Sequence, residues 1–389
     1  MRSSIIVSAL VAVLVGFGGS VAIVIAAAQA VGATQAQTSS WVTMFCISIM
    51  ITSTLLSVMY KKPLITAWST PGAALIATSS GLSIEQATGA FIFVGVLITL
   101  SGLIGPFGRL IERIPASIAT AILAGVLFPF ILAVTQSVNS DPWFGLPLVL
   151  TFIVVRIFSP SWAVICTLAL GILMAVGFGR MTPIHQLEVS GLAWVTPTFD
   201  PAALISVGLP LFLVTMASQN LPGFAVLRAS GYSIQAKPIF LTTGIASILS
   251  GFFSAHTTSL AAITASICTS PDAHPDPQKR WMCGPVYSVG YGVLAVFGAS
   301  LVTLFTSFPA ELISIVAGVA LIGSFVNSLS TSFWTRDDHL PATIAFVVTA
   351  SGTSFAGIGS AFWGLIIGLT LLSMNKIAGV RALDPSDKP

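Results

Sequence analysis

The chain carries no Asp, Glu, Lys or Arg from Ser3 to Tyr60. A run this long without charge cannot cover the surface of a soluble domain, and it holds room for more than one bilayer span of about 20 apolar residues. Only 7% of all residues are charged, 55% are hydrophobic, and the mean hydropathy is +0.98. Soluble proteins carry about 25% charged residues. The sequence therefore predicts an all-α polytopic membrane protein embedded in a lipid bilayer and excludes soluble enzymes. The net charge of +3 forms no basic stripe, which excludes nucleic acid as a partner.

Charged residues divide the chain into segments of membrane-spanning length. Three charge-free runs, 3–60, 238–271 and 340–375, each have room for two elements, so the spacing predicts fourteen transmembrane elements. With both termini in the cytoplasm, every Lys and Arg except Arg180 then falls on the cytoplasmic side, including Arg156 in a connection. Because the positive-inside rule requires this arrangement, we expect a multi-pass protein of a bacterial inner membrane. The first apolar run continues into the second without a charge, which predicts an uncleaved first span.

Two short segments of the chain resemble each other. Residues 67–78 read AWSTPGAALIAT and residues 255–266 read AHTTSLAAITAS, with identical residues at five aligned positions. A second pair, in which Pro-Ala precedes Ala-Gly-Val, begins at Pro115 and at Pro309 and is displaced by nearly the same amount. Seven predicted elements separate the members of each pair, and an odd number inserts the two copies in opposite directions. The pattern therefore indicates an inverted repeat, which is typical of secondary transporters.

The repeat divides the chain into two halves of seven elements each. The first repeat is predicted at residues 1–180 and the second at 201–376. A periplasmic linker at 181–200 joins them, and a cytoplasmic tail follows at 377–389.

The matched segments also carry the chemistry of a helix start. Thr70 is a good N-cap, and Pro71 suits the first helical turn that follows it. We expect extended chain at 63–66 before this helix, and in the second copy extended chain at 252–254 with Thr258 as the cap. Both segments are then half-helices of elements 3 and 10 that begin inside the membrane. Their unpaired N–H groups and positive dipole ends would face one small volume, which predicts an anion site.

Four sequence motifs carry a resemblance to a known family. They are AWSTPGAAL (67–75), LPLFLVTMASQNLPG (209–223), AAITASICTSPDAHPD (261–276) and GIGSAFWGL (357–365). With these motifs in both halves, the chain resembles the benzoate:proton symporter (BenE) family over essentially its whole length. That family is similar in turn to the uracil/xanthine and sulfate-type transporters. The resemblance implies an aromatic carboxylate as substrate, imported with a proton, and no cofactor.

The same resemblance implies the domain organisation. Seven-plus-seven transporters have a core domain, here about 1–108 and 201–308, and a gate domain, here about 109–180 and 309–376. Alternating access of the core against the gate would move the substrate across the membrane. Dimers occur among these transporters, so a homodimer is compatible with the resemblance.

One departure from the uracil-type pattern is informative. Positions where those relatives carry carboxylates correspond here to Ser218-Gln219 and His256, and neutral or cationic groups there suit an anionic ligand. His256 is the only ionisable side chain expected inside the membrane, and we predict that it couples transport to a proton. The substrate-binding residues predicted from the half-helices, the first element and element 8 are Phe17, Gly18, Ser20, Ser69, Thr70, Gly72, Ala73, Ser218, Gln219, Asn220, His256, Thr257, Thr258, Ser259 and Leu260.

Other interpretations of these residues stay open at this point. An anion exchanger or channel for small carboxylates would use the same scaffold, and the substrate could instead carry its own proton. A remote alternative, an intramembrane serine protease, would need Ser360 and His256 to face each other. Residues 271–276, PDAHPD, suit a proline-rich turn better than a metal site, so no metal is expected. Tryptophans near predicted span ends, Trp41 among them, are typical of interfacial anchors.

Overall fold

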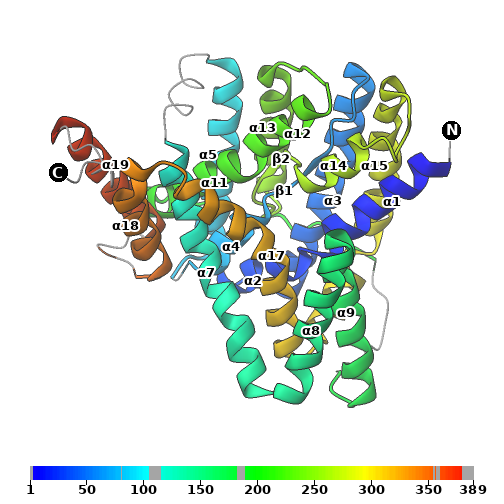
Figure 1. Cartoon of the computed structure of the whole chain (residues 1–389). Helices are drawn as coiled ribbons and strands as arrows, with labels where there is room; N and C mark the ends of the chain where they lie inside the picture. The colour runs from blue at the N-terminus through cyan, green and yellow to red at the C-terminus, as the bar shows by residue number, and fades with distance from the viewer. Residues whose placement is uncertain are drawn as a thin grey trace, which may run out of the picture.

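The fold is almost entirely helical, with two short strands at its centre (Figure 1). The computed structural model describes residues 3–79, 81–104, 115–181, 189–353, 355 and 360–378. The first half holds α1 (Ser3–Gly18), α2 (Val21–Ala30), α3 (Gln35–Tyr60), β1 (Thr66–Trp68), α4 (Thr70–Ala77), α5 (Ile84–Leu103), α7 (Ala116–Ser140), α8 (Pro142–Phe158) and α9 (Pro160–Gly177).

The second half begins with one long helix that contains two π-helical turns. Its parts are α10 (Pro201–Ala203), η1 (Leu204–Gly208), α11 (Leu209–Thr215), η2 (Met216–Asn220) and α12 (Leu221–Ala229). Each π-helical turn ends just before a Leu-Pro dipeptide, and the widened turn makes room for a proline ring that would clash with the carbonyl four residues earlier.

The remaining elements complete the fold. They are α13 (Ala236–Gly251), β2 (Thr258–Leu260), α14 (Ile263–Thr269), η3 (Pro277–Met282), α15 (Cys283–Val296), α16 (Gly298–Thr306), α17 (Ala310–Ser332), η4 (Arg336–Asp338), α18 (His339–Ala350) and α19 (Ser360–Ala378).

Six helical stretches in the described chain are long and apolar enough to cross a membrane, and a seventh is formed if the bent pair Pro277–Val296 and Gly298–Thr306 is one span. The six are Ser3–Ala30, Gln35–Tyr60, Ile84–Leu103, Ala116–Ser140, Pro201–Arg228 and Ala310–Ser332. The polytopic class is therefore supported. The count of fourteen elements, the repeat halves and the side of each terminus stay predictions. The charged residues expected at 105–114 and most of the tail lie outside the described residues.

The helices fall into two groups by their contacts. In the strand bundle, α3 packs against α15, and α5 packs against α13, around the two strands. In the α7–α17 bundle, α7 packs against α17 and α18, α8 against α9, and α18 against α19. The strand bundle comprises α1–α5 and α10–α16 with both strands, and the second bundle comprises α7–α9 and α17–α19. The core and gate boundaries given above remain a prediction.

The two strands pair antiparallel at the centre of the strand bundle. Thr66 lies opposite Leu260, and Trp68 lies opposite Thr258. The Thr66 backbone N–H donates to the Ser53 hydroxyl of α3 at 3.0 Å, and the Thr66 carbonyl oxygen accepts from the Tyr287 hydroxyl of α15 at 3.2 Å. Backbone that is not helical survives at membrane depth only where other groups satisfy it, and these hydroxyls contribute to that satisfaction.

A strand does precede each short helix, but both predicted starts were displaced. Ser69, not Thr70, caps α4, since the Ser69 hydroxyl accepts a hydrogen bond from the Gly72 N–H at 3.1 Å. In the second copy, Thr258 was predicted as a cap but is a strand residue, and α14 begins only at Ile263.

The residues expected to be extended at 252–254 instead follow the end of α13 at Gly251. They form a turn that includes Ser254 at a φ of +64°. Because the chain needs this turn before it can enter the strand, the second strand starts later than the sequence alignment of the two segments suggests.

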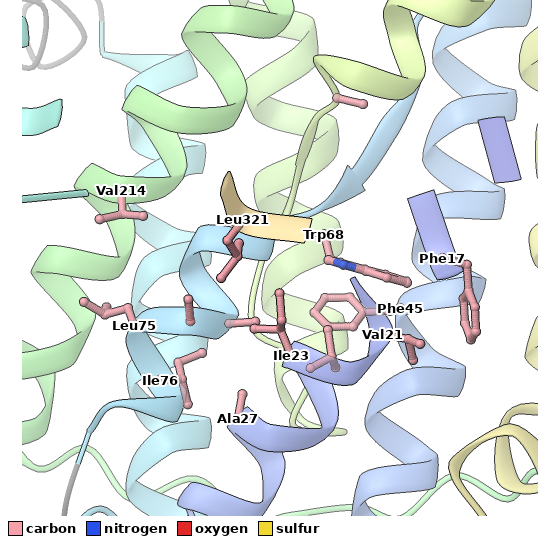
Figure 2. Packing of buried hydrophobic residues seen from close by; sticks show 14 of the residues in the cluster. Phe17, Val21, Ile23, Ala27, Phe45, Trp68, Leu75, Ile76, Val214 and Leu321 are labelled. Atoms are coloured by element: carbon pink, nitrogen blue, oxygen red, sulfur yellow. The ribbon is translucent and has the colours of Figure 1, made fainter. Parts of the chain in front are cut away.

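Apolar packing fixes α4 between its neighbours. Figure 2 shows the rings of Phe17, Phe45 and Trp68 side by side, with Leu75 of α4 pointing toward Val214 of α11. The Trp68 ring centroid lies 5.7 Å from that of Phe17 and 5.4 Å from that of Phe45. Apolar contacts therefore hold the segment from Trp68 to Leu75 at both of its ends.

Candidate functional site

A cavity of about 470 Å³ lies between the strand bundle and the α7–α17 bundle. From the strand bundle it is lined by the first turn of α4, the turn η2, the end of α1, and the segment that leads from β2 into α14. From the other bundle it is lined by α7, α8, α9 and α17. A volume of this size suits a small ligand, and its position between two helix groups is a common one for ligand sites.

Four of the predicted binding residues line this cavity: Ser20, Thr70, Ser218 and Gln219. The Ser20 hydroxyl donates to the Gly16 carbonyl at 2.6 Å and accepts from the Trp68 indole N–H at 2.9 Å. The Ser218 hydroxyl donates back to a carbonyl of its own helix, that of Val214.

The side chains of Thr70 and Gln219 differ from these two serines. Neither makes a hydrogen bond within the described part of the chain, and both are partly exposed. They are therefore available to a ligand.

The other predicted residues are described by the structure but do not line the cavity. Several are strand or helix residues whose polar groups bond inside the protein. Thr257 contacts Thr215 at 3.2 Å, Thr258 contacts Ser48 at 2.7 Å, and the Asn220 amide oxygen accepts from the Leu260 N–H at 2.9 Å.

The remaining residues of this set act in packing, capping or strand pairing. A Cβ on Gly72 would lie 2.6 Å from Leu211 Cδ1, so Gly72 permits close packing of α4 on α11. Phe17, Ser69, Ala73 and Ser259 complete this group, whereas Gly18 ends α1 and a Cβ on it would meet no atom within 4 Å.

His256 lies behind the cavity wall. Its side chain is fully buried, and its Nε2 lies 2.9 Å from the Ser69 carbonyl oxygen, which indicates that Nε2 donates there. Its Nδ1 has no partner among the described residues. The rings of Trp41, Phe45 and Phe91 surround the imidazole, with centroids at 5.8, 4.7 and 6.0 Å. His256 therefore reaches the cavity only through Ser69, the cap of α4.

Trp41 was expected as an interfacial anchor, and that expectation is wrong. Its ring is 0% exposed and forms one wall of the histidine pocket, whereas Trp143 is 88% exposed. Proximity to a predicted span end cannot distinguish the two cases, because the sequence does not show which helices surround that end.

The cavity also contains residues that the sequence analysis missed. Trp68 and Tyr291 give it aromatic walls, with ring centroids 6.1 Å apart. Thr264, in the first turn of α14, is 4% exposed, and its buried hydroxyl has no partner among the described residues. Arg156 also lines it, although it was expected in a cytoplasmic connection. A tyrosine or arginine within an apolar run is the signal that could have found two of them.

A second, smaller cavity of about 310 Å³ lies at the other end of α4. It is lined by Leu75, Thr78 and Ser79 after α4, by Gly125 and Val126 of α7, and by residues of α18 and α19. The helix α7, which contacts α4, lines both cavities.

The structure does not bring together the two residues that the protease interpretation requires. The Ser360 hydroxyl donates to the Thr349 carbonyl at 2.9 Å, whereas His256 contacts Ser69, so the two protease candidates do not meet. Within the described residues, no group of three or more His, Cys, Asp or Glu could hold a metal ion.

The fold is shared with solved anion transporters. The transmembrane domain of the cyanobacterial bicarbonate transporter BicA aligns with a TM-score of 0.58 at 12% identity, over 94% of this chain and 97% of that one. The structure of SLC26A9 aligns with a TM-score of 0.66 at 11% identity, over 97% of this chain and 66% of that one. At these identities, the likeness concerns the fold.

Sequence relatives are much closer. The chain is 39% identical to "Inner membrane protein YdcO" of Escherichia coli (strain K12), over 94% of this chain and 95% of that protein. It is 33% identical to "Benzoate membrane transport protein" of Acinetobacter baylyi, over 93% of each. The family described as "Benzoate membrane transport protein" matches residues 1–374. The chain therefore belongs to the BenE family of membrane transporters and is not an enzyme.

Proposed function

We propose that this transporter imports benzoate or a similar aromatic carboxylate together with a proton across a bacterial inner membrane. The observation that carries the proposal is the cavity at the start of α4. It combines aromatic walls, Trp68 and Tyr291, with the side chains of Thr70 and Gln219, which make no hydrogen bond to any described residue. An aromatic carboxylate needs both kinds of surface. The relative named as a benzoate transport protein supports the same substrate class.

The start of α4 is suited to the carboxylate. A helix N-terminus stabilises an anion by about 0.3–2 kcal/mol, whereas desolvating a carboxylate costs several kcal/mol. The helix end alone is therefore insufficient, and side-chain donors must add to it. Gln219 and Thr70 line the same cavity and can supply such donors.

The room for the aromatic ring comes from small residues. Gly16 and Gly19 of the α1 end and Ala261 and Ala262 before α14 line the cavity. A Cβ on Gly16 would lie 2.9 Å from the Tyr291 hydroxyl, so any larger residue there would intrude on this wall.

Alternating access is the transport mechanism that we propose. The two cavities lie at opposite ends of α4, and each is lined by both bundles. Movement of the strand bundle against the α7–α17 bundle could open one cavity while it closes the other.

Coupling to a proton follows from charge arithmetic. An inside-negative potential opposes import of a monovalent anion by about 2.3 kcal/mol per 100 mV. One proton per carboxylate removes that penalty and allows the pH gradient to drive accumulation. We assign the coupling to His256, whose contact with the Ser69 carbonyl connects it to the helix start. By linkage, the proton and the anion would each favour the binding of the other.

The test is uptake of radiolabelled benzoate into proteoliposomes that hold the full chain. An imposed pH gradient, acidic outside the vesicles, and a separately imposed potential distinguish the mechanisms. We expect accumulation that follows the pH gradient and is insensitive to the potential, with competition by other aromatic carboxylates and little by acetate. Uptake that follows the potential alone indicates a channel, and uptake that requires a trans anion indicates an exchanger. Absence of benzoate transport would contradict the proposal.

A further inference from the structure

Arg156 is the one charged side chain among the described residues that line the cavity. It lies in the last turn of α8, and its side chain is half-buried. The cavity wall formed by the strand bundle carries hydroxyls, amides and backbone groups but no charge within its described lining. The positive charge therefore comes from the α7–α17 bundle, whereas α4 belongs to the strand bundle.

In the part of the chain that the structure describes, the guanidinium group of Arg156 has neighbours but no counter-charge. It lies 5.5 Å from the centroid of the Phe152 ring. A Cβ on Gly323 of α17 would lie 3.7 and 3.9 Å from its two terminal nitrogens, so the group rests beside a position without a side chain. Among the described residues, no carboxylate lies within ion-pair distance of it, and it makes no hydrogen bond.

An arginine in this state has unsatisfied binding capacity. Guanidinium presents five N–H donors in a planar fork that matches a carboxylate with two parallel hydrogen bonds. Partial burial of a cation without a partner is unfavourable, and a carboxylate that enters the cavity relieves it. A lysine ammonium offers only a point charge on a flexible stem. The planar guanidinium of arginine also selects ligands by the direction of their hydrogen bonds.

We propose that Arg156 binds the carboxylate of the substrate and selects anionic over neutral aromatic ligands. This inference rests on the function proposed above and deepens it. It also explains how the cavity obtains a cation even though His256 lies behind its wall. A substrate held by Arg156 on one side and by Thr70 or Gln219 on the other is bound by both helix bundles.

The test is ligand binding to the purified full chain by isothermal titration calorimetry, with benzoate and neutral benzamide as the two probes. The variants are Arg156→Gln, Arg156→Lys and, as a matched control, Arg228→Gln, which removes an exposed arginine at the end of α12. Hydrogen bonds to charged groups contribute enough that we expect the Kd for benzoate to rise about 10-fold or more in Arg156→Gln. The Kd for benzamide should change by less than about 2-fold. Arg156→Lys should be intermediate for benzoate, and Arg228→Gln should match the unmodified chain.

Each outcome decides the question. If Arg156→Gln binds benzoate as the unmodified chain does, Arg156 is not the carboxylate ligand. If the affinities for benzoate and for benzamide fall equally in Arg156→Gln and in Arg156→Lys, Arg156 shapes the cavity and does not recognise the charge of the ligand. That result also overturns the inference. Failure of the unmodified chain and of Arg228→Gln to bind benzoate contradicts the proposed function instead. Thermal unfolding without ligand verifies the fold of Arg156→Gln. If Arg156→Gln is unfolded, benzoate binding by Arg156→Lys, compared with the unmodified chain, decides the question.

Discussion

Replacement of His256 by glutamine separates the two roles that this residue could have. The imidazole Nε2 lies 2.9 Å from the Ser69 carbonyl oxygen, and Ser69 caps α4. A glutamine amide nitrogen can occupy the Nε2 position and donate the same hydrogen bond, but it cannot take up a proton. We therefore expect His256→Gln to keep the helix start in place and to abolish proton coupling.

The magnitude follows from the coupling and from the geometry. One proton per carboxylate permits about 10-fold accumulation per pH unit, equivalent to about 1.4 kcal/mol. In His256→Gln this ratio should fall to about 1, while counterflow exchange of benzoate persists. His256→Asn is the matched control, because its shorter amide should not reach Ser69 and loses the hydrogen bond, a cost of about 0.5–1.5 kcal/mol. The Ser69 carbonyl keeps its second donor, the Ala73 N–H, in both variants.

The assay is radiolabelled benzoate uptake into proteoliposomes at imposed pH gradients, with counterflow measured in the same preparation. Benzoic acid crosses bilayers unaided, so the uptake of protein-free liposomes is subtracted and initial rates are compared. Collapse of accumulation in both variants, with counterflow retained in His256→Gln, supports coupling by a proton on the imidazole. Accumulation by His256→Gln with unchanged pH dependence would refute that reasoning and favour a substrate that carries its own proton. A defect in His256→Asn alone would assign His256 to positioning of α4.

Two further predictions concern stability. Gly244→Ala should lower the free energy of unfolding by about 1–3 kcal/mol through overpacking. Its Cβ would lie 2.3 Å from Thr99 Oγ1 and 2.6 Å from the Thr99 backbone nitrogen. The control Gly177→Ala should leave the free energy of unfolding unchanged, because a Cβ there meets nothing within 4 Å. Thermal unfolding in detergent measures both, and equal stability of the two variants would contradict the packing argument. The Arg180 guanidinium lowers the pKa of the Asp141 carboxyl, so its stabilisation is present above the carboxyl's unfolded pKa and is lost as pH falls through the lowered native value. Asp141→Asn should therefore unfold at a lower temperature at neutral pH, and a difference that persists unchanged in strong acid would refute this assignment.

The parts of the structure that depend on local sequence could be predicted. The Ser-Thr-Pro-Gly string predicts a helix start because capping and proline at the first turn are local effects, and α4 begins there within one residue of the expected cap. The second copy has no such string. The helix α14 has no side-chain cap, and the backbone turn at Ser254 shifts the start of β2 toward the C-terminus. The alignment of the two segments therefore placed both the strand and the helix too early in the chain. Similar sequence in the two segments therefore predicted the motif but not its register.

Placement of the site residues depends on packing between distant segments. Ser218 and Gln219 reach the cavity because a π-helical turn precedes Pro222, whereas Asn220 in the same turn points to the strand and binds Leu260. Helical spacing places consecutive residues about 100° apart around the axis, but it does not show which of the three faces the cavity. The cytoplasmic side of Arg156 stays a prediction, but its place in the cavity lining was missed for a different reason. The positive-inside rule assigns an arginine to a membrane surface but does not say whether its side chain extends into a cavity between helices.

The proposals together constrain how charge moves during transport. Arg156 belongs to α8, which packs with α7, α9 and α17, whereas Thr70 and Gln219 belong to the strand bundle. If the strand bundle carries the substrate past the other bundle, Arg156 attracts the carboxylate without itself crossing the membrane. The moving site is then uncharged when empty and, with one anion and one proton bound, uncharged when loaded. Both halves of the cycle would therefore be electroneutral, and the cation on the stationary wall gives anion selectivity without adding a charge that the membrane potential could act on.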